Sequence, residues 1–581
     1  MLKDFFKKHG WRYVPGILLL VLCAYIQTLS PLALGRAVEL AENRAPWSAF
    51  IKEAASVFVI AILVFVTRFG WRWFVIITSR EMEVYIRDRL YTHLVYLPVD
   101  FYGRNRSGNL MAYAINDVNA VRMMFGMVVA QVVNSLSSVM FSIGRMSGSI
   151  HPMLTLYSLL PVPMAIMAVI IIGKKIRIRA KRAQDLFSVL SGHVNENING
   201  MRVLKAFAQE KAQYLDYEKE SLEKQRANES WYFTGALMDP VIKTVFGISY
   251  AIGLIYGGHL VMNNAISLAD YVAFNSYLTM IVFPVVAIGR ISNNLQRGLA
   301  SYKRLKELFD EEEVPAFDKT DDGKEIGDGI VAKNLTFRYK DATRNALEEI
   351  SFTVKPGGML GVVGPTGGGK STLLSLFVKL VPPSPGQLFI GGRDIYEIPA
   401  LSLRKQTGFV PQDGFLFDES IRDNVRFFSD ATQEEIDLAL NDAGMTGDID
   451  DMPEKQDTLC GERGNHLSGG QRQRVSLARA LVRNPKLLIL DDTLSAVDAH
   501  TETQILKSLK TRLAGCTSVV VAHRLSAVRD ADEILYIADG RITERGTHEE
   551  LLEKNGDYAR LYALQNRQEE NEDGKESHGK L

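Results

Sequence analysis

The stretch Gly364-Pro365-Thr366-Gly367-Gly368-Gly369-Lys370-Ser371-Thr372 matches the phosphate-binding pattern G-x-x-x-x-G-K-[ST] at every defined position. An apolar run precedes it and a helical pattern follows it, which is the strand–loop–helix context of a nucleotide site. The glycines let backbone N–H groups face phosphate oxygens, Lys370 would neutralise the β- and γ-phosphates, and the Ser371 hydroxyl would ligate Mg²⁺. The alternative, a glycine-rich surface turn, fits this flanking context poorly. The stretch therefore predicts a nucleotide site.

Length and composition set the frame for this site. A chain of 581 residues is too long for one ordinary core, so we expect two or more domains. Lys plus Arg and Asp plus Glu both number 67, which gives no overall basic footprint for nucleic acid. Cys23, Cys460 and Cys516 lie far apart, with neither disulfide nor zinc spacing.

The first half of the chain contains six apolar segments long enough to span a bilayer, each needing ~20 residues. They are Val14–Leu34, Phe50–Ser79, Met123–Ile150, Pro152–Gly173, Thr234–Val261 and Leu268–Arg290. Polar side chains within them should face neighbouring helices or a water-filled pathway, and the candidates are Arg72, Gln131, Asn134, Asp239 and Lys243. The plainer alternative is that Asp239 and Lys243, four residues apart, simply pair along one helix face.

Loop charge predicts the orientation and the domain boundaries. The N-terminus and the loops Glu81–Arg122 and Lys174–Trp231 are rich in Lys and Arg, so both termini and these loops should be cytoplasmic. Helical periodicity in the two loops predicts cytoplasmic helix extensions with turns near Asn116–Asn119 and Gln209–Gln213. We expect a membrane domain over 1–312, a polar linker over 313–329, a soluble domain over 330–565 and a disordered tail over 566–581.

Three further residues of the soluble domain fit a nucleotide site. Asp491 ends an apolar strand and is placed to hold Mg²⁺ through water. Gln412 could reach the same metal or the attacking water. Tyr339 is a candidate for stacking on adenine, although a tyrosine in a strand is more often a packing residue.

The stretch Leu467-Ser468-Gly469-Gly470-Gln471 opens a helix and combines a hydroxyl, backbone N–H groups and a helix dipole, which makes a second anion site. An ordinary helix cap is the alternative. One nucleotide does not need two phosphate sites in one chain, whereas two chains arranged head to tail would each complete the other's site.

These motifs together resemble the ATP-binding-cassette (ABC) exporters across nearly the whole chain. In that family's terms Gly364–Thr372 resembles the Walker A loop, Gln412 the Q-loop, Leu467–Gln471 the signature, Asp491 the Walker B aspartate and His523 the switch histidine. The D-loop match is Ser495-Ala496-Val497-Asp498, and Tyr339 matches the adenine-stacking position.

The resemblance implies a six-helix, all-α membrane exporter domain followed by an α/β P-loop nucleotide-binding domain, the type IV exporter architecture. It implies ATP and Mg²⁺ as cofactors and a multi-pass protein of the cell membrane with its nucleotide-binding domain in the cytoplasm. It also implies a half-transporter, so that two such chains form one export pathway.

Position 492 departs from the family pattern, which usually has a glutamate that polarises the attacking water. Asp492 is one methylene shorter, by about 1.5 Å, and misplacement by ~1 Å can cost on the order of a hundredfold in rate. The sequence thus resembles heterodimeric bacterial multidrug exporters with unequal sites, and implies a second half-transporter as partner and amphipathic small molecules as substrates.

Several alternatives remain. Backbone adjustment or a bridging water could restore catalysis at Asp492. A homodimeric lipid or peptide exporter would share the fold but should favour glutamate here, and an ATP-gated membrane sensor would use the shorter residue to stay closed on ATP. The six apolar segments argue against a soluble DNA-maintenance ATPase.

Overall fold

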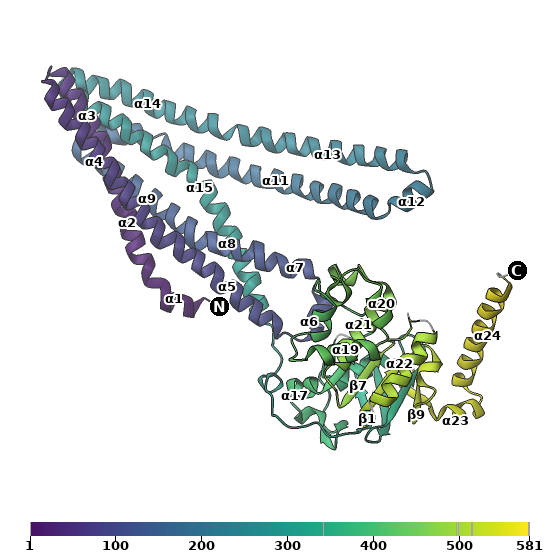
Figure 1. Ribbon diagram of the computed structural model, residues 1–581. Coiled ribbons are helices and arrows are strands. Elements are labelled where there is room, and N and C mark those ends of the chain that lie inside the picture. The colour runs from purple at the N-terminus through teal and green to yellow at the C-terminus, as the bar shows by residue number, and fades with distance from the viewer. Residues whose placement is uncertain (1, 341, 496, 498, 513–514, 579–581) are drawn as a thin grey trace. The chain divides into compact units, whose positions relative to one another are not determined.

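Figure 1 shows a computed structural model of the chain, which describes residues 2–340, 342–495, 497, 499–512 and 515–578. The chain divides into two compact units, and each is treated by itself below. The N-terminal unit comprises Met1–Val95 and Asn105–Glu311, and the C-terminal unit comprises Tyr96–Arg104 and Glu312–Leu581.

The described residues of the N-terminal unit contain six helical spans long and apolar enough to cross a bilayer. The spans are Lys3–Glu42, Trp47–Val95, Ser107–Ile150, Pro152–Asn199, Glu210–Met262 and Leu268–Phe309. Its main α-helices are α1 (Lys3–His9), α2 (Tyr13–Gln27), α3 (Leu29–Glu42), α4 (Trp47–Arg72), α5 (Thr78–Val95), α7 (Ser107–Ala112), α8 (Val118–Met123), α9 (Val129–Arg145), α10 (Pro152–Leu159), α11 (Val162–Asn199), α12 (Met201–Ala206), α13 (Glu210–Ala236), α14 (Met238–Met262) and α15 (Leu268–Phe309). Each span overlaps one predicted apolar segment, so the predicted six-helix membrane domain is confirmed.

Helix α15 shows how sequence sets these elements. It begins at a capping box in which the Ser267 hydroxyl accepts the Asp270 N–H (3.0 Å) and the Asp270 carboxylate accepts the Ser267 N–H (3.1 Å). Phe274 and Tyr277 on α15 are fully buried. The Tyr277 hydroxyl donates to the Thr28 carbonyl, 2.7 Å away, which ties α15 to the start of α3.

The turns of the two long helical excursions lie partly where the sequence predicts. Residues 113–119 are continuous helix, so the turn predicted near Asn116–Asn119 is wrong. The chain instead reverses around α6 (Val99–Arg104), which is bounded by a break at Pro98 on one side and at Asn105–Arg106 on the other. In the second excursion α11 and α13 run side by side and are joined through α12, so the turn ends at Gln209, at the edge of the predicted range (Figure 1).

The C-terminal unit contains two sheets in its described residues. The larger has the order β10-β9-β3-β8-β7-β6, parallel except for β10, and the smaller is antiparallel with the order β2-β1-β4-β5. The strands are β1 (Ile330–Phe337), β2 (Leu347–Val354), β3 (Met359–Val363), β4 (Leu388–Ile390), β5 (Arg393–Asp394), β6 (Thr407–Val410), β7 (Leu487–Asp491), β8 (Thr517–Val521), β9 (Glu533–Ala538) and β10 (Arg541–Gly546). The helices, besides α6, are α16 (Lys370–Phe377), α17 (Ala400–Lys405), α18 (Ile421–Arg426), α19 (Gln433–Asp442), α20 (Thr446–Asp450), α21 (Gly469–Leu481), α22 (Ala499–Arg512), α23 (His548–Glu553) and α24 (Asp557–His578).

This topology places the predicted site. In an open parallel sheet, ligands bind beyond the carboxyl ends of the strands. The phosphate loop follows β3, Gln412 follows β6, Asp491 ends β7, and His523 follows β8. Since these four strands are neighbours in one parallel sheet, the four motifs meet at a single edge.

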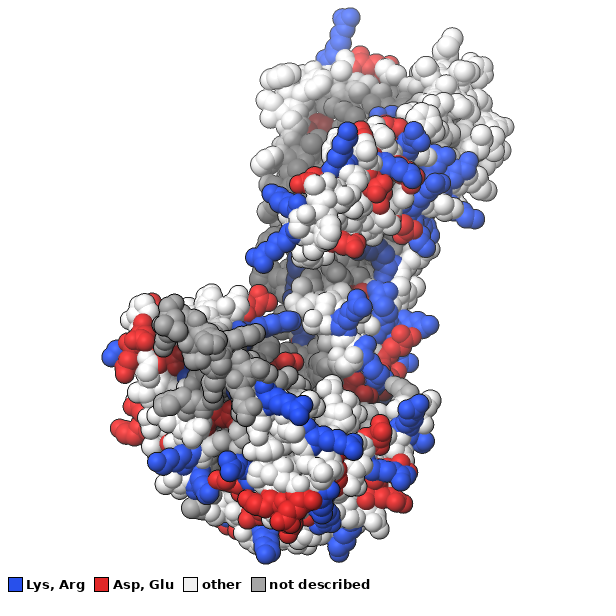
Figure 2. Space-filling view, turned by 90° about the vertical axis from the view of Figure 1, so that its right-hand side faces the viewer, with Lys and Arg blue, Asp and Glu red and all other residues white. Residues whose placement is uncertain are grey.

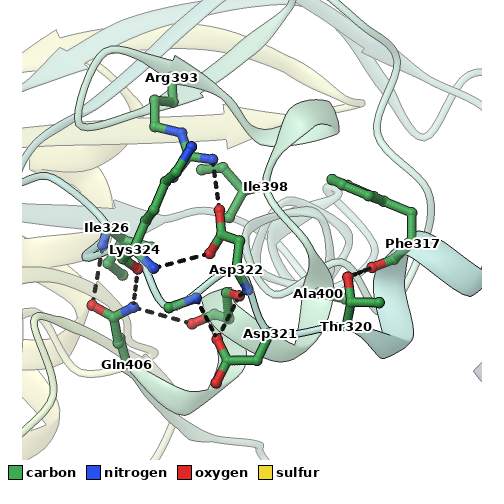
Figure 3. Close-up of polar contacts among 12 residues, drawn as sticks. Phe317, Thr320, Asp321, Asp322, Lys324, Ile326, Arg393, Ile398, Ala400 and Gln406 are labelled. Atoms are coloured by element: carbon green, nitrogen blue, oxygen red, sulfur yellow. Dashed lines mark hydrogen bonds and ion pairs between the residues drawn. The ribbon is translucent and has the colours of Figure 1, made fainter.

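The segment predicted as a linker is bonded to the C-terminal unit (Figure 3). The Asp322 carboxylate accepts from Arg393 (3.0 Å), and the Gln406 side chain bonds the main chain of both Lys324 and Ile326. Asp321 pairs with Lys405 at 2.7 Å, and this hydrogen bond is the largest cause that lowers the pKa of Asp321 to about 2. The segment is therefore attached to the sheet domain and is not a free tether.

A second attachment of the same segment is more deeply buried. The Lys379 ammonium donates to the Asp318 carboxylate (2.6 Å) and to the Ile398 carbonyl (2.9 Å). Asp318 also accepts the Ala400 N–H at 3.0 Å. Because the Lys379 side chain is only 6 % exposed, this pair fixes the short helical turn Ala316–Lys319 against α17.

Charges of both signs alternate on the surface. Figure 2 shows Lys and Arg interspersed with Asp and Glu over the visible face, in keeping with the equal totals of the two kinds. The described residues of that face therefore form a mixed surface, unlike the one-sign basic surface that tracks a nucleic-acid backbone.

Candidate nucleotide site

A cavity of about 570 Å³ lies at the carboxyl edge of the parallel sheet. It is lined by Arg344, Asn345, Ala346, Thr366, Gly367, Gly369, Lys370, Ser371, Thr372, Gln412, Asp491, Val521, His523, Asp539 and Gly540. The phosphate loop, Gln412, Asp491 and His523 thus come from four separate stretches of sequence to one cavity. Its volume is within the usual range for small-molecule sites, about 300–1,000 Å³.

The glycines of the phosphate loop are required by the backbone. Gly364, Gly367 and Gly369 have φ values of +142°, +81° and +104°, which side chains rarely adopt. A Cβ atom on Gly364 would lie 2.1 Å from the Ile537 carbonyl oxygen, and one on Gly369 would lie 2.6 Å from the Ala346 carbonyl oxygen. The loop can therefore wrap closely only without side chains at these positions.

The remaining loop residues complete the turn into α16. The Gly368 N–H donates to the Pro365 carbonyl (3.1 Å), and the Lys370 ammonium donates to the carbonyls of Gly364 and Pro365 (2.8 and 2.9 Å). Burial lowers the pKa of Lys370, and the nearby carboxylates of Asp491 and Asp492 oppose this shift. The ammonium thus lies at the loop that the sequence assigns to phosphates.

Residues with oxygen atoms suited to Mg²⁺ line the cavity. They are Ser371, Gln412 and Asp491. Burial raises the pKa of Asp491, and the nearby Ser371 hydroxyl opposes this shift. A hydroxyl, a carboxylate and an amide are hard oxygen donors, so these residues fit a magnesium ion bound together with nucleotide phosphates.

Asp492 takes a different direction from Asp491. Its Oδ1 accepts the backbone N–H of His523 at 3.2 Å, and its own φ is +49°. The residue is 9 % exposed and, among the described residues, does not line the cavity that contains His523 and Asp491. The Asp492 carboxylate is therefore held by the backbone of the loop that carries His523.

Tyr339 lies at the phosphate helix. Its hydroxyl is 3.2 Å from the Thr372 hydroxyl, and its ring packs edge-on against Phe337 at 5.0 Å between centroids. The side chain is partly exposed, so a face remains accessible for a base beside the loop. Both the packing and the stacking interpretations are compatible with this position.

The signature stretch lies away from this cavity in the described structure. Ser468 accepts the Gln471 N–H (3.2 Å) while the Gln471 side chain accepts the Ser468 N–H (2.9 Å), a complete capping box at the start of α21. Leu467 precedes this cap, and Gly469 and Gly470 lie between its two capping residues. The ordinary helix-cap interpretation is thus satisfied within one chain, and an added role would need an anion from elsewhere.

The D-loop residues are partly described. The Ser495 hydroxyl donates to the Asp492 carbonyl (3.0 Å), and the Val497 N–H donates to the Leu494 carbonyl (3.2 Å). Ala496 and Asp498 lie outside the described residues. The described part of the loop thus begins as a turn directly against Asp492.

One wall of the cavity comes from residues outside the motifs that the sequence indicates. Arg344 and Asn345 come from the turn before β2, and Asp539 and Gly540 from the β9–β10 hairpin. Asp539-Gly540 is a typical hairpin signal, and its φ values of +50° and +77° fit that turn. The sequence therefore predicts a hairpin there, but pattern alone does not show that it reaches the phosphate loop.

The predicted substrate-pathway residues do not gather in one place. Asp239 and Lys243 form an ion pair at 2.7 Å along α14 with both side chains mostly exposed, as the plainer alternative has it. Arg72 is exposed on α4, with its guanidinium 5.7 Å from the Trp71 ring centroid. On α9, Gln131 and Asn134 are half-buried, and the Gln131 Oε1 atom is buried without a hydrogen-bond partner.

A P-loop nucleotide cavity joined in one chain to six membrane-spanning helices defines the class: a membrane transporter with its own ATP-binding domain. Two family models match accordingly, "ABC transporter transmembrane region" over residues 14–285 and "ABC transporter" over residues 347–495.

Relatives cover almost the whole chain. The Bacillus subtilis protein YheI, described as a probable multidrug resistance ABC transporter ATP-binding/permease protein, is 37 % identical over 97 % of this chain and 96 % of its own length. The Escherichia coli multidrug resistance-like ATP-binding protein MdlA is 34 % identical over 97 % of this chain and 95 % of its own. A solved bacterial Atm1-family ABC exporter with ATP bound has the same fold, with a TM-score of 0.77 at 24 % identity over 95 % of this chain and 98 % of that one.

The chain belongs to the ABC transporters and has the type IV exporter fold that the sequence predicts. It is a multi-pass membrane protein that uses ATP and couples its hydrolysis to transport. Proteins of this family act as dimers in the membrane, which gives the signature stretch a second chain to meet.

Proposed function

We propose that this chain is one half of a heterodimeric exporter of amphipathic small molecules, and that its own ATP site binds ATP tightly but hydrolyses it slowly. The observation that carries the proposal is Asp492. Its carboxylate is one methylene shorter than the glutamate usual in the family, and its Oδ1 accepts the His523 backbone N–H at 3.2 Å.

The geometry around Asp492 supports slow hydrolysis. A general base must come within about 2.6–3.2 Å of the proton that it takes, directly or through one water. A short carboxylate that is bonded to the main chain and does not line the described cavity reaches an attacking water poorly. Asp491, Ser371 and Gln412, by contrast, lie where Mg²⁺ and phosphates would be held, so binding is retained.

The signature supports a two-chain site. Ser468-Gly469-Gly470-Gln471 is complete, and its capping box leaves further backbone N–H groups at the start of α21 for an anion. In the proposed complex this end of α21 would meet ATP held by the partner's phosphate loop. The partner would supply the catalytic glutamate at that second site.

The substrate class and orientation belong to the same proposal. The printed descriptions of the Bacillus and Escherichia relatives name multidrug resistance, and unpaired polar atoms such as Gln131 Oε1 occur within otherwise apolar spans. We place the protein in the plasma membrane with both termini and the nucleotide-binding domain in the cytoplasm, on the basis of loop charge.

The test compares the full chain alone with the mixed complex. The chain is reconstituted in lipid nanodiscs by itself and with a half-transporter from the same source that carries glutamate at the matching position. ATP turnover should be slow alone and at least tenfold faster in the complex. Energised, inverted vesicles should accumulate the dye Hoechst 33342 only with both chains present.

Each failure points to a named alternative. If the chain alone hydrolyses ATP as fast as the mixed complex and transports dye, the homodimeric exporter replaces the proposal. If ATP closes the complex but no dye, lipid or peptide is transported, the ATP-gated sensor replaces the proposal.

A further inference from the structure

The loop that carries His523 is held on two sides. On one side Arg524 donates to the buried Glu502 carboxylate (3.2 Å) and to the Val497 carbonyl (2.9 Å), and the Ser526 hydroxyl donates to Glu502 at 2.6 Å. These bonds connect the loop to α22 and to the turn after Asp492.

The other side is held by one side chain of the C-terminal helix. The Gln565 amide group donates from Nε2 to the His523 carbonyl at 2.6 Å and accepts the Leu525 N–H on Oε1 at 3.0 Å. Leu525 is the first residue of a short 3₁₀ turn whose preceding residue, Arg524, makes no side-chain cap, so Gln565 takes that place. The same carboxamide thus uses its donor and its acceptor on one three-residue segment.

The two peptide groups around His523 are therefore both fixed. Its N–H donates to Asp492 and its C=O accepts from Gln565. A side chain leaves the backbone in a direction set by these two peptide planes, so the pair of bonds directs the imidazole, which lines the nucleotide cavity.

Helix α24, which carries Gln565, is firmly attached below this point. The Glu544 carboxylate accepts the N–H groups of Asp557 (2.5 Å) and Tyr558 (3.2 Å) at its first turn. Tyr558 is fully buried, and its hydroxyl is 2.7 Å from His548 Nδ1. Gln565 is thus presented by a helix whose base is anchored in the domain core.

We propose that Gln565 is a positioning residue for the switch histidine: its carboxamide, bonded to the His523 carbonyl and the Leu525 N–H, holds the imidazole at the ATP phosphates. This inference rests on the match of His523 to the switch histidine of the ABC exporters. Gln565 is not among the described residues that line the nucleotide cavity, so it acts through the loop.

The test uses the full chain in nanodiscs with Mg²⁺ and ATP. Gln565→Met keeps the side-chain length and removes both hydrogen bonds, and we expect kcat to fall about tenfold while KM for ATP changes less than twofold. Hydrogen exchange of the Leu525 amide should accelerate. Leu564→Ala, an exposed neighbour on α24, is the matched control and should change neither quantity.

Gln565→Glu separates the two bonds. The carboxylate can still accept the Leu525 N–H but cannot donate to the His523 carbonyl. We expect Leu525 to keep its protection from exchange while kcat falls as in the methionine variant. A kcat close to wild type would contradict the assigned contact to His523.

A double-mutant cycle excludes a merely structural role. In a His523→Ala background, Gln565→Met should lower the residual kcat less than twofold, because the two changes act through one group. An equal loss in both backgrounds, or loss of exchange protection throughout α24, would overturn the proposal.

Running the same variants in an Asp492→Glu chain separates this inference from the proposed function. If Asp492→Glu fails to speed hydrolysis but Gln565→Met still lowers kcat in the wild-type chain, the slow-site proposal fails and this one stands. If Asp492→Glu speeds hydrolysis and Gln565→Met changes nothing in either chain, this inference fails alone.

Discussion

Replacing Asp492 with glutamate tests the central feature of this nucleotide site. The change adds one methylene, which extends the carboxylate by about 1.5 Å from the main chain, and errors of ~1 Å in placement cost on the order of a hundredfold. In the wild-type chain Oδ1 is bonded to the His523 N–H at 3.2 Å. A longer side chain can pass this N–H and approach the attacking water.

Two effects oppose each other in this variant. A gain of ten- to a hundredfold in kcat corresponds to about 1.4–2.7 kcal/mol of activation free energy. Residue 492 has a φ of +49°, a conformation that aspartate tolerates better than glutamate, so we also expect a loss of roughly 1 kcal/mol in folding stability. The first effect acts on rate and the second on the melting temperature, so they are measured independently.

The assay is steady-state phosphate release by the full chain in nanodiscs, with saturating Mg²⁺ and ATP. Asp492→Asn removes the charge at constant size and should give no gain. Lys370→Ala added to the glutamate variant should abolish the gain, since Lys370 belongs to the same chain's phosphate loop. A glutamate variant that folds, binds ATP and hydrolyses it no faster than wild type would refute the claim that the short side chain of Asp492 limits hydrolysis.

Three further measurements test the geometry of the C-terminal unit. Gly369→Ala places a Cβ against a backbone oxygen at φ +104°, so binding of a fluorescent ATP analogue should weaken at least tenfold, and unchanged binding would contradict the loop geometry. Lys379→Met leaves the mostly buried Asp318 carboxylate without its cation, so the free energy of unfolding should fall by about 3 kcal/mol and the melting temperature by about 6–10 °C. Lys405→Met removes the cation of the more exposed Asp321 pair and should lower the melting temperature by less than about 3 °C. Burial raises the pKa of both Cys460 and Cys516 to about 11, so these thiols are protonated at pH 8 and become reactive only as the pH rises toward that value. Maleimide at pH 8 should therefore label these two buried cysteines only after unfolding, which peptide mass spectrometry can verify.

Much of this architecture could be predicted because its signals are local. A bilayer requires ~20 apolar residues per span, and this length requirement gave all six spans without knowledge of their packing. The phosphate loop could be predicted because Gly364 and Gly369 are demanded by the backbone itself.

Other features depend on contacts between distant residues. The turn around α6 was missed because the charged, helical pattern runs on after it through residues 113–119, and Pro98 is the local signal that indicates it. The cavity wall from Asp539 and Gly540 depends on β9 pairing with β3, which no local pattern reveals. The roles of Asp492 and the signature across two chains remain predictions.

The bonded segment between α15 and β1 has a mechanical consequence. Helix α15 ends at Phe309, and hydrogen bonds to the C-terminal unit begin with the Val314 N–H, which donates to the Tyr96 carbonyl at 2.8 Å. Only about four residues therefore lie between the end of α15 and this hydrogen bond. We predict that glycines inserted between Phe309 and Val314 would lengthen this connection and lower the amount of transport per ATP hydrolysed.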